Sequence, residues 1–370
     1  MSLVSKRLFL VCTGLGQVQR GFETYVQDLA EKLGSLPDFA SNQLTVLSSA
    51  KVNIPGTKNI IVPCIKRNSP LWPKKISYQT RFYIEQSTFF LGMIVLLFRN
   101  RNAVFYLGEY TLYCYIFKLR NLLKFKQHLV LYTGGQVFPG LFNVSKDFIH
   151  HVTNIYLKDG NNNYPLERQF LLPHFVKEDY LFDQDQFEAI KQKASGKQIF
   201  LSVGVVDSST KQMDVFLQML SEYKDKVFPI ILGDKSPETP SILTLAINLF
   251  GHDGFIVDCV DRKCLNVYYS VADCFVLLSP KESFGLAYLE ALLRGKPVIA
   301  RKFEESTYVL GNAARLVAND GECKKAIQKV VSEGMVYNQC HIPTHQYVIH
   351  KYSWTYLKPL YINMFKRFCA

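Results

Sequence analysis

Short apolar runs alternate with helical patterns along the first third of the chain. Leu8–Cys12 is apolar throughout, as expected for a strand buried on both faces. Residues 22–33 then carry apolar side chains at helical spacing, and the pattern stops at Gly34. Strands over residues 44–47, 103–107 and 128–132, and a helix over residues 77–98, continue the alternation. This order predicts a parallel sheet with helices on both faces.

The pattern is interrupted and then starts again. Residues 158–175 contain a polar stretch rich in glycine and asparagine and then a short apolar piece. A second series of strands is expected over residues 199–203, 229–232, 254–257, 273–278 and 297–300. We therefore predict an α/β protein with two Rossmann-like parallel-sheet domains facing a cleft, over residues 1–175 and 176–350, and a helix over residues 351–370. Domains of this kind bind ligands at the carboxyl ends of their strands.

Composition and charge narrow the class of protein. The 370 residues are 48% hydrophobic and 20% charged, which is typical of a folded protein and unlike a disordered one. The net charge of +12 favours anionic partners, such as a phosphate-bearing ligand or an anionic membrane. The chain has no arginine-rich run and no zinc-ligand spacing, so no nucleic-acid partner is expected.

The N-terminus pairs basic residues with an apolar run, as a signal peptide does. It has no cleavage site and leads directly into a glycine-rich turn, so a buried first strand is the better interpretation. The nine cysteines are scattered and odd in number, which favours reduced thiols and a cytoplasmic protein. The longest apolar run, Thr88–Phe98, is shorter than the ~20 residues that a membrane span needs.

Two interpretations of the basic, aromatic part of the N-terminal domain stay open. It could lie on the inner face of an anionic membrane and meet a lipid-linked acceptor, or it could be a buried helix with solvated basic ends. The residues concerned are Phe89, Phe90, Leu96, Phe98, Arg99, Arg101, Lys118, Arg120, Lys124 and Lys126.

The most informative stretch is Asp273–Ala300, which has the pattern strand, loop, helix, strand. Glu282 falls in the loop and Glu290 in the helix, and eight residues are close to two helical turns, so both carboxylates can approach one side. The helix begins around Ser283–Leu286, where the amides of Phe284, Gly285 and Leu286 suit a phosphate or a sugar hydroxyl. Glu290 lies among apolar residues and therefore needs a partner.

A resemblance adds roles to these residues. The stretch Glu282-Ser-Phe-Gly-Leu-Ala-Tyr-Leu-Glu290 resembles the acid–seven–acid motif of the retaining family 4 glycosyltransferases, also grouped as glycosyl transferases group 1. The resemblance implies the glycosyltransferase-B fold, with a C-terminal helix crossing back to the first domain. It also implies that Glu282 contacts the donor sugar and Glu290 the nucleotide ribose.

Other segments resemble the same family. In Leu201–Asp214, the loop after Gly204 matches the strand–glycine–basic loop whose lysine holds the donor diphosphate, which assigns that role to Lys211. The first loop, with Gly14, Gly16 and Arg20, resembles the glycine-rich loop that faces the donor. The Tyr132–Gln136 segment ends a strand near the cleft, and its Gly134 and Gly135 are expected to contact substrate. Tyr352-Ser-Trp354 resembles the start of the C-terminal helix.

The chain departs from the family at two positions. Val205 stands where the family often has an arginine, and the loop at Gly134 lacks the usual histidine or aspartate. His150 and His151 follow in a segment with a helical pattern, and we interpret them as core or surface residues rather than ligands. The pair Asp183 and Asp185 is interpreted as part of a solvated linker, and no metal site is expected.

These features predict transfer of a sugar from a nucleoside-diphosphate sugar, with retention, without a metal or other cofactor. The acceptor and the base that deprotonates it are not identified. Two alternatives remain. A non-catalytic nucleotide-sugar or glycan-binding protein would bind without forming product. An NAD(P)-dependent oxidoreductase or epimerase would need an intact dinucleotide fingerprint, which the first loop lacks because Gln19 interrupts it.

Overall fold

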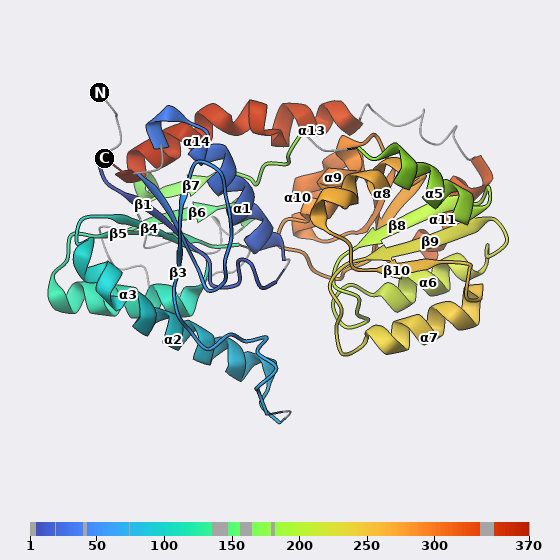
Figure 1. Ribbon diagram of the computed structural model, residues 1–370. Helices are drawn as coiled ribbons and strands as arrows, with labels where there is room; N and C mark the ends of the chain where they lie inside the picture. Colours follow the sequence, from blue (N-terminus) through green and yellow to red (C-terminus); the bar gives the residue numbers. More distant parts are fainter. Residues whose placement is uncertain are drawn as a thin grey trace. The chain divides into compact units, whose positions relative to one another are not determined.

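The computed structural model describes residues 5–18, 20–39, 43–73, 75–134, 147–155, 165–178, 182–333 and 344–369. The chain divides into two compact units: residues 1–173 with 358–370, and residues 174–357. Each described unit is built on one parallel sheet, as Figure 1 shows. The predicted fold, two α/β domains with parallel sheets, is therefore confirmed.

The first unit has a seven-stranded sheet in the order β3-β2-β1-β4-β5-β6-β7, and neighbouring strands are parallel. The strands are β1 (Leu8–Val11), β2 (Leu44–Ser48), β3 (Lys58–Ile61), β4 (Val104–Leu107), β5 (His128–Tyr132), β6 (Phe148–His151) and β7 (Gln169–Leu171). Strands β1, β2 and β4 are buried along their whole length, as continuous apolar runs predict.

Helices cover both faces of this sheet (Figure 1). They are α1 (Gly21–Gly34), α2 (Tyr78–Arg99) and α3 (Tyr110–Leu123), with the 3-10 turns η1 (Pro37–Phe39) and η2 (Leu166–Arg168). Helix α2 begins at Ser77, whose hydroxyl accepts a hydrogen bond from the amide of Thr80 at 3.1 Å. Its inner face packs Phe89, Met93 and Leu97 against the strands.

Helix α2 is also the one described helix whose length and composition would suffice for a membrane span. Core helices of water-soluble proteins pass the same test. The helix is longer than the apolar run Thr88–Phe98 seen in the sequence, because less apolar residues extend it at its N-terminal end. Phe89, Met93 and Leu97 are 0% exposed, so one face of α2 belongs to the protein core.

The second unit has a six-stranded sheet in the order β10-β9-β8-β11-β12-β13, again parallel. Its strands are β8 (Gln198–Val203), β9 (Val227–Leu232), β10 (Ile256–Asp258), β11 (Cys274–Leu277), β12 (Val298–Arg301) and β13 (Arg315–Val317). The helices are α5 (Gln184–Ala194), α6 (Met213–Ser221), α7 (Thr239–Phe250), α8 (Leu265–Val271), α9 (Leu286–Leu293), α10 (Glu304–Leu310), α11 (Asp320–Glu333) and α13 (Thr344–Tyr352), with the turns η3 (Arg262–Cys264) and η4 (Gly311–Ala313).

Helix α14 (Trp354–Cys369) ends the described chain and is shared between the units. Its first residues, to Leu357, belong to the second unit, and residues 358–370 belong to the first, in agreement with a C-terminal helix that returns to the N-terminal domain. Within the first unit, the Tyr361 hydroxyl donates to the Pro173 carbonyl at 2.8 Å, and the Phe365 ring packs against the Tyr106 ring.

Candidate functional site

The site in the second unit begins where β8 ends. Gly204 follows the strand, and the aliphatic part of the Lys211 side chain lies over it, so that a Cβ at position 204 would be 3.1 Å from the lysine carbons. The loop between them is held by Asp207, which is 6% exposed. Its carboxylate accepts hydrogen bonds from the amides of Thr210 and Lys211, at 3.1 Å and 2.7 Å. This turn fixes the backbone from which Lys211 extends.

Lys211 and Glu282 form an ion pair, which joins the loop after β8 to the loop after β11. The two strands are neighbours in the sheet, so their carboxyl ends meet at the same edge. The side chains are 21% and 15% exposed, so both can reach a ligand and neither is freely solvated. The structure thus brings together the two residues to which the family resemblance gives the donor diphosphate and the donor sugar.

The start of α9 lies next to this ion pair in the chain. Gly285 has φ +79° and precedes Leu286, the first helical residue. Among the described residues no side-chain hydrogen bond caps this end, so the first amides of the helix can bind an acceptor group. Ser283 is exposed, whereas the Phe284 ring is 4% exposed and packs against His174 and Tyr352. Phe284 can therefore offer its backbone to a ligand but not its side chain.

Glu290 has different partners from Glu282. Its carboxylate accepts a hydrogen bond from the Tyr269 hydroxyl at 2.9 Å, and the Arg262 guanidinium lies 3.9 Å from the other oxygen. The Glu290 side chain is 13% exposed. An acid in apolar surroundings was expected to need a partner, and Tyr269 and Arg262 are those partners.

Several residues of this site were missed by the sequence analysis. Arg262 and Tyr269 lie in η3 and α8, and no motif connects them with Glu290 in the sequence. Glu238 accepts hydrogen bonds from the Ser209 hydroxyl at 2.7 Å and from the amides of Ser208 and Ser209 at 2.9 Å and 3.2 Å, and these bonds, the hydroxyl's most of all, lower its pKa. The Asp-Ser-Ser-Thr run at residue 207 is a turn signal that could have indicated the Asp207 contacts.

The glycine-rich loop of the first unit lies at the carboxyl end of β1. Gly16 has φ +80°, which favours glycine. A Cβ on Gly14 would lie 2.1 Å from a carboxylate oxygen of Glu23, so a larger residue there would require the Glu23 side chain to move. Arg20 is exposed and its guanidinium lies over the Tyr78 ring, 5.1 Å from the centroid, with a hydrogen bond to the Tyr78 hydroxyl. The structure therefore connects Arg20 with the start of α2.

A buried polar cluster lies beside this loop. The Thr13 amide and hydroxyl both donate to Glu109, each at 2.9 Å. The same hydroxyl accepts from Arg67 and Gln86, at 2.9 Å and 2.7 Å. Arg67 forms an ion pair with Glu85, and both side chains are at most 2% exposed. The cluster gathers residues from four separate segments, which explains why no sequence motif indicated it.

Among the acids of this cluster, Glu109 has the pKa that lies furthest from its ordinary value. Its pKa is raised to about 7, mainly by burial and in smaller part by the nearby Glu23 carboxylate, while the Thr13 hydrogen bonds and Arg67 oppose the rise. One carboxylate oxygen, Oε2, is buried and has no hydrogen-bond partner in the described part of the chain. A protonated or half-protonated carboxyl at this position is therefore expected near neutral pH.

The segment with His150 and His151 was wrongly expected to be helical. It forms strand β6, paired with β5 and β7, because burial on both faces overrides the pattern. The His150 Nε2 lies 2.7 Å from the Leu172 carbonyl and its Nδ1 lies 2.7 Å from the Tyr106 hydroxyl, so Nε2 carries the proton. Burial lowers the pKa of each histidine to about 4. Both are core residues.

Three further predictions concern single positions. Gly134 ends the described part of its loop with φ +39°, and Gly135 lies outside the described residues. Asp183 was wrongly interpreted as part of a solvated linker: its carboxylate caps α5 by accepting from the Gln186 amide at 3.0 Å, and Asp185 lies in the first turn. Within the described ranges, no group of three or more His, Cys, Asp or Glu side chains is arranged to hold a metal ion.

Comparison with known proteins agrees with this geometry. Residues 183–342 match the family model described as glycosyl transferases group 1. The matched range contains Lys211, Glu282 and Glu290, so in the second unit the match agrees with the resemblance to glycosyl transferases group 1 that these motifs carry. No curated protein matches the chain in sequence.

Solved structures resemble the whole chain in fold. Sucrose-phosphate synthase from Thermosynechococcus elongatus has a TM-score of 0.75 at 16% identity, over 97% of this chain and 99% of that one. A glycosyltransferase from Rickettsia africae has a TM-score of 0.72 at 15% identity, over 98% of both chains. HepE from Anabaena, solved with UDP, has a TM-score of 0.72 at 12% identity, over 98% of this chain and 100% of that one. These likenesses confirm the glycosyltransferase-B fold.

Proposed function

We propose that the chain is a glycosyltransferase that moves a sugar from a nucleoside-diphosphate sugar to an acceptor with retention of anomeric configuration. The observation that carries the proposal is the Lys211–Glu282 ion pair beside the uncapped start of α9. It places a cation, an acid and free backbone amides at neighbouring strand ends. The family match over the same residues and the UDP bound to HepE support a nucleotide-sugar donor.

Lys211 and the first amides of α9 would bind the donor diphosphate. A nucleoside diphosphate gains negative charge as it leaves the sugar, and preorganised donors stabilise that charge by about 3 kcal/mol each. Because Glu282 holds the lysine in place, the cation does not have to be ordered when the donor binds. We propose that these groups replace a metal ion at the diphosphate.

The two acids would contact the donor at different points. Glu282 lies beside the diphosphate cation and would position the sugar ring through its hydroxyls. Glu290 would accept hydrogen bonds from the ribose. The Tyr269 hydroxyl, which donates to this carboxylate, and the nearby Arg262 guanidinium would hold it in position for these bonds. We propose that the leaving phosphate takes the proton of the acceptor hydroxyl, so that the reaction needs no separate protein base.

The test combines binding with product detection. Nucleoside diphosphates and their sugars, with NAD as a control, are measured by thermal shift with and without EDTA. A shift with one nucleoside diphosphate that survives EDTA, together with release of that diphosphate from its sugar, is the expected result. The anomeric configuration of the product, measured by NMR, then tests retention.

Other outcomes would contradict the proposal. Binding of a nucleotide sugar without release of diphosphate, across glycan, lipid-linked and small-molecule acceptors, would indicate a binding protein of the same fold. A shift with NAD alone would indicate an oxidoreductase or epimerase. Loss of the shift in EDTA would overturn the metal-independent mechanism while leaving the donor assignment in place.

A further inference from the structure

The charge of the first unit is distributed very unevenly along the chain. Between Gln43 and Gly134 the sequence has thirteen Lys and Arg residues and only two acids, Glu85 and Glu109. Both acids are buried, at 0% and 8% exposure. Arg67 and Arg120 are also buried, in ion pairs, and add nothing to the surface. The exposed charged residues of this stretch, which includes α2 and α3, are therefore all basic.

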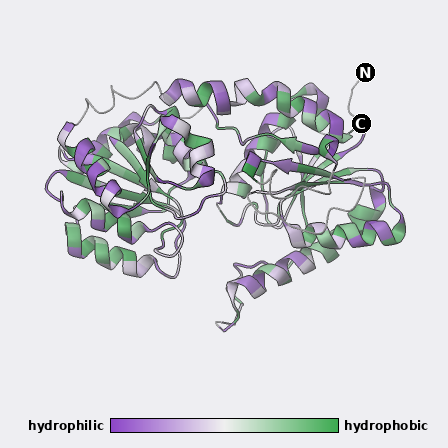
Figure 2. Ribbon diagram, turned by 180° about the vertical axis from the view of Figure 1, so that it is seen from behind, coloured by the Kyte–Doolittle hydropathy of each residue, from purple (hydrophilic) through white to green (hydrophobic). Residues whose placement is uncertain are grey.

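Apolar side chains are exposed on the same two helices. On α2, Leu91 and Val95 are 63% and 58% exposed, and on α3 Leu122 is 78% exposed. Leu91, Val95 and Phe98 follow helical spacing, so they share one face, opposite the core residues of α2. Figure 2 shows the long apolar stretches of these two helices. Only 28% of the most apolar 18-residue part of α2 is buried inside the protein.

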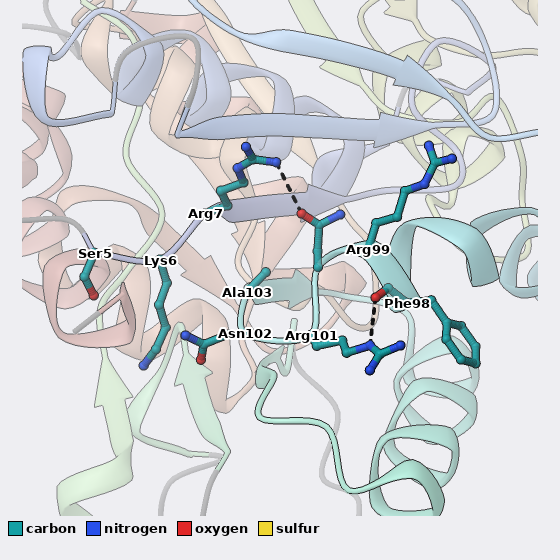
Figure 3. Close-up of a pocket in the computed structure, with 9 residues that line it drawn as sticks. Ser5, Lys6, Arg7, Phe98, Arg99, Arg101, Asn102 and Ala103 are labelled. Atoms are coloured by element: carbon teal, nitrogen blue, oxygen red, sulfur yellow. Dashed lines mark hydrogen bonds between the residues drawn. The ribbon is translucent and has the colours of Figure 1, made fainter.

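A basic hollow lies at the C-terminal end of α2. It has a volume of about 630 Å³ and is lined by Lys6, Arg7, Arg99 and Arg101, with Asn100 and Asn102 between them. Figure 3 shows these side chains around the opening. The Arg101 guanidinium lies over the rings of Phe98 and Phe125, 5.8 Å and 5.2 Å from their centroids, which keeps it next to the apolar face.

The C-terminal ends of α2 and α3 are in contact, so the exposed groups form one surface. The rings of Phe98 and Phe125 meet edge to face at 5.2 Å. Leu122, Lys124 and Lys126 are exposed close to Phe125 in the chain. We call this surface, made of Leu91, Val95, Phe98, Arg99, Arg101, Leu122, Lys124 and Lys126, the α2–α3 face.

We propose that the α2–α3 face docks on a membrane surface that contains anionic phospholipid. The aliphatic side chains would enter the interfacial layer, and the cations of the hollow would bind lipid phosphates. The pairing of exposed aliphatic residues with cations favours a lipid surface over a polyanion such as nucleic acid, which offers no apolar layer to Leu91 and Val95. The core contacts of Phe89, Met93 and Leu97 mean that α2 would lie on the membrane rather than cross it.

The full chain is tested by flotation with vesicles of phosphatidylcholine alone and of phosphatidylcholine mixed with phosphatidylglycerol. We expect binding to the anionic vesicles that weakens with salt. The variant Arg99→Ala/Arg101→Ala should lower the partition coefficient roughly 30-fold, since each cation near an anionic surface contributes about a factor of five. The variant Leu91→Ser/Val95→Ser should lower it at least 10-fold, because two aliphatic side chains no longer leave water.

Matched controls change equally exposed residues elsewhere. Lys191→Ala/Lys193→Ala removes two exposed cations from α5, and Leu166→Ser removes an apolar side chain that is 71% exposed. Both should bind vesicles like the wild type, and all variants should keep the wild-type circular dichroism spectrum. The proposal would be overturned if the control variants lost vesicle binding to the same extent, or if the wild type bound neutral vesicles as well as anionic ones. It would also be overturned if Leu91→Ser/Val95→Ser weakened binding to the polyanion heparin as much as it weakened binding to vesicles. Because flotation needs no sugar donor, its result is independent of the proposed glycosyl transfer.

Discussion

Lys211 combines a packed stem with a charged end that meets Glu282. Its aliphatic carbons lie over Gly204 and its ammonium group pairs with the Glu282 carboxylate. Lys211→Ala should weaken binding of a nucleoside diphosphate about 10- to 150-fold, as expected from the loss of roughly 1.5–3 kcal/mol for a charged hydrogen bond. Isothermal titration calorimetry measures the change.

The matched control for this prediction is Lys281→Ala. Lys281 is an exposed cation in the same loop as Glu282, and its removal should leave nucleotide affinity almost unchanged. The double variant Lys211→Ala/Glu282→Gln separates loss of the cation from repulsion by the remaining acid. Wild-type affinity in Lys211→Ala would place the diphosphate elsewhere.

Glu109 should make the stability of the protein depend on pH. Its pKa is about 7 in the folded protein and 4.5 in the unfolded chain, so the unfolded chain loses its proton first as pH rises. The free energy of unfolding should therefore fall between pH 4.5 and about 7 and stay lowered above that. Glu109→Gln removes this term and should stabilise the protein by up to about 3 kcal/mol above pH 7, with little effect near pH 4.5.

Chemical denaturation of both proteins across this pH range checks the prediction. His150 and His151, whose pKa values are lowered to about 4, act in the opposite direction because the unfolded chain binds their protons more tightly. They are present in both proteins, so the difference between the two curves isolates Glu109. A difference that does not change with pH would show that Glu109 is ionised in the folded protein.

At the scale of elements, the start of α9 depends on glycine for two reasons. Gly285 has φ +79°, and a Cβ there would lie 2.3 Å from the Tyr288 ring. Gly295, at the other end of α9, has φ +70° but open space around it. Gly295→Ala should therefore cost only about 1–2 kcal/mol of left-handed strain. Gly285→Ala should cost more and should also weaken nucleotide binding, because the first turn of α9 has to move.

Urea denaturation and calorimetry on the two alanine variants test this difference. Equal costs and equal nucleotide affinities would mean that Tyr288 moves aside easily and that the first turn of α9 is not a binding element. If Gly295→Ala lost nucleotide affinity and Gly285→Ala did not, the C-terminal end of α9 would matter for binding rather than its start, which would contradict the proposed site.

The sequence predicted those elements whose pattern is local. Helix α9, with Glu282 before it and Glu290 inside it, was predicted because apolar spacing, a glycine and two acids all lie in one segment. Strand β6 was not, because His150 and His151 show no strand pattern in the sequence. His150 is stabilised by partners on β4 and just after β7. Arg262 and Tyr269 were missed for the same reason: they meet Glu290 only after the sheet has brought separate loops together.

At the scale of the whole molecule, α14 contributes to the core of the first unit while beginning in the second. Phe365 is 0% exposed and packs against Phe39, Tyr106 and Phe368. Phe365→Ala should destabilise the first unit by about 3–5 kcal/mol, the usual cost of removing a buried phenylalanine. Leu360→Ala, which changes a side chain that is 48% exposed on the same helix, is the matched control.

The chain has two tryptophans, one in each unit, which allows the units to be followed separately. Trp72 belongs to the first unit, and Trp354, which packs against Phe175 at 4.7 Å, belongs to the second. In a Trp354→Phe background, Phe365→Ala should lower the unfolding midpoint reported by Trp72. In a Trp72→Phe background, the midpoint reported by Trp354 should stay close to its reference. It should still rise with nucleoside diphosphate, because Lys211, Glu282 and Glu290, which we propose bind the donor, lie in the second unit. Equal lowering of both midpoints would instead show that the two units unfold together, since a two-state transition gives every probe the same midpoint.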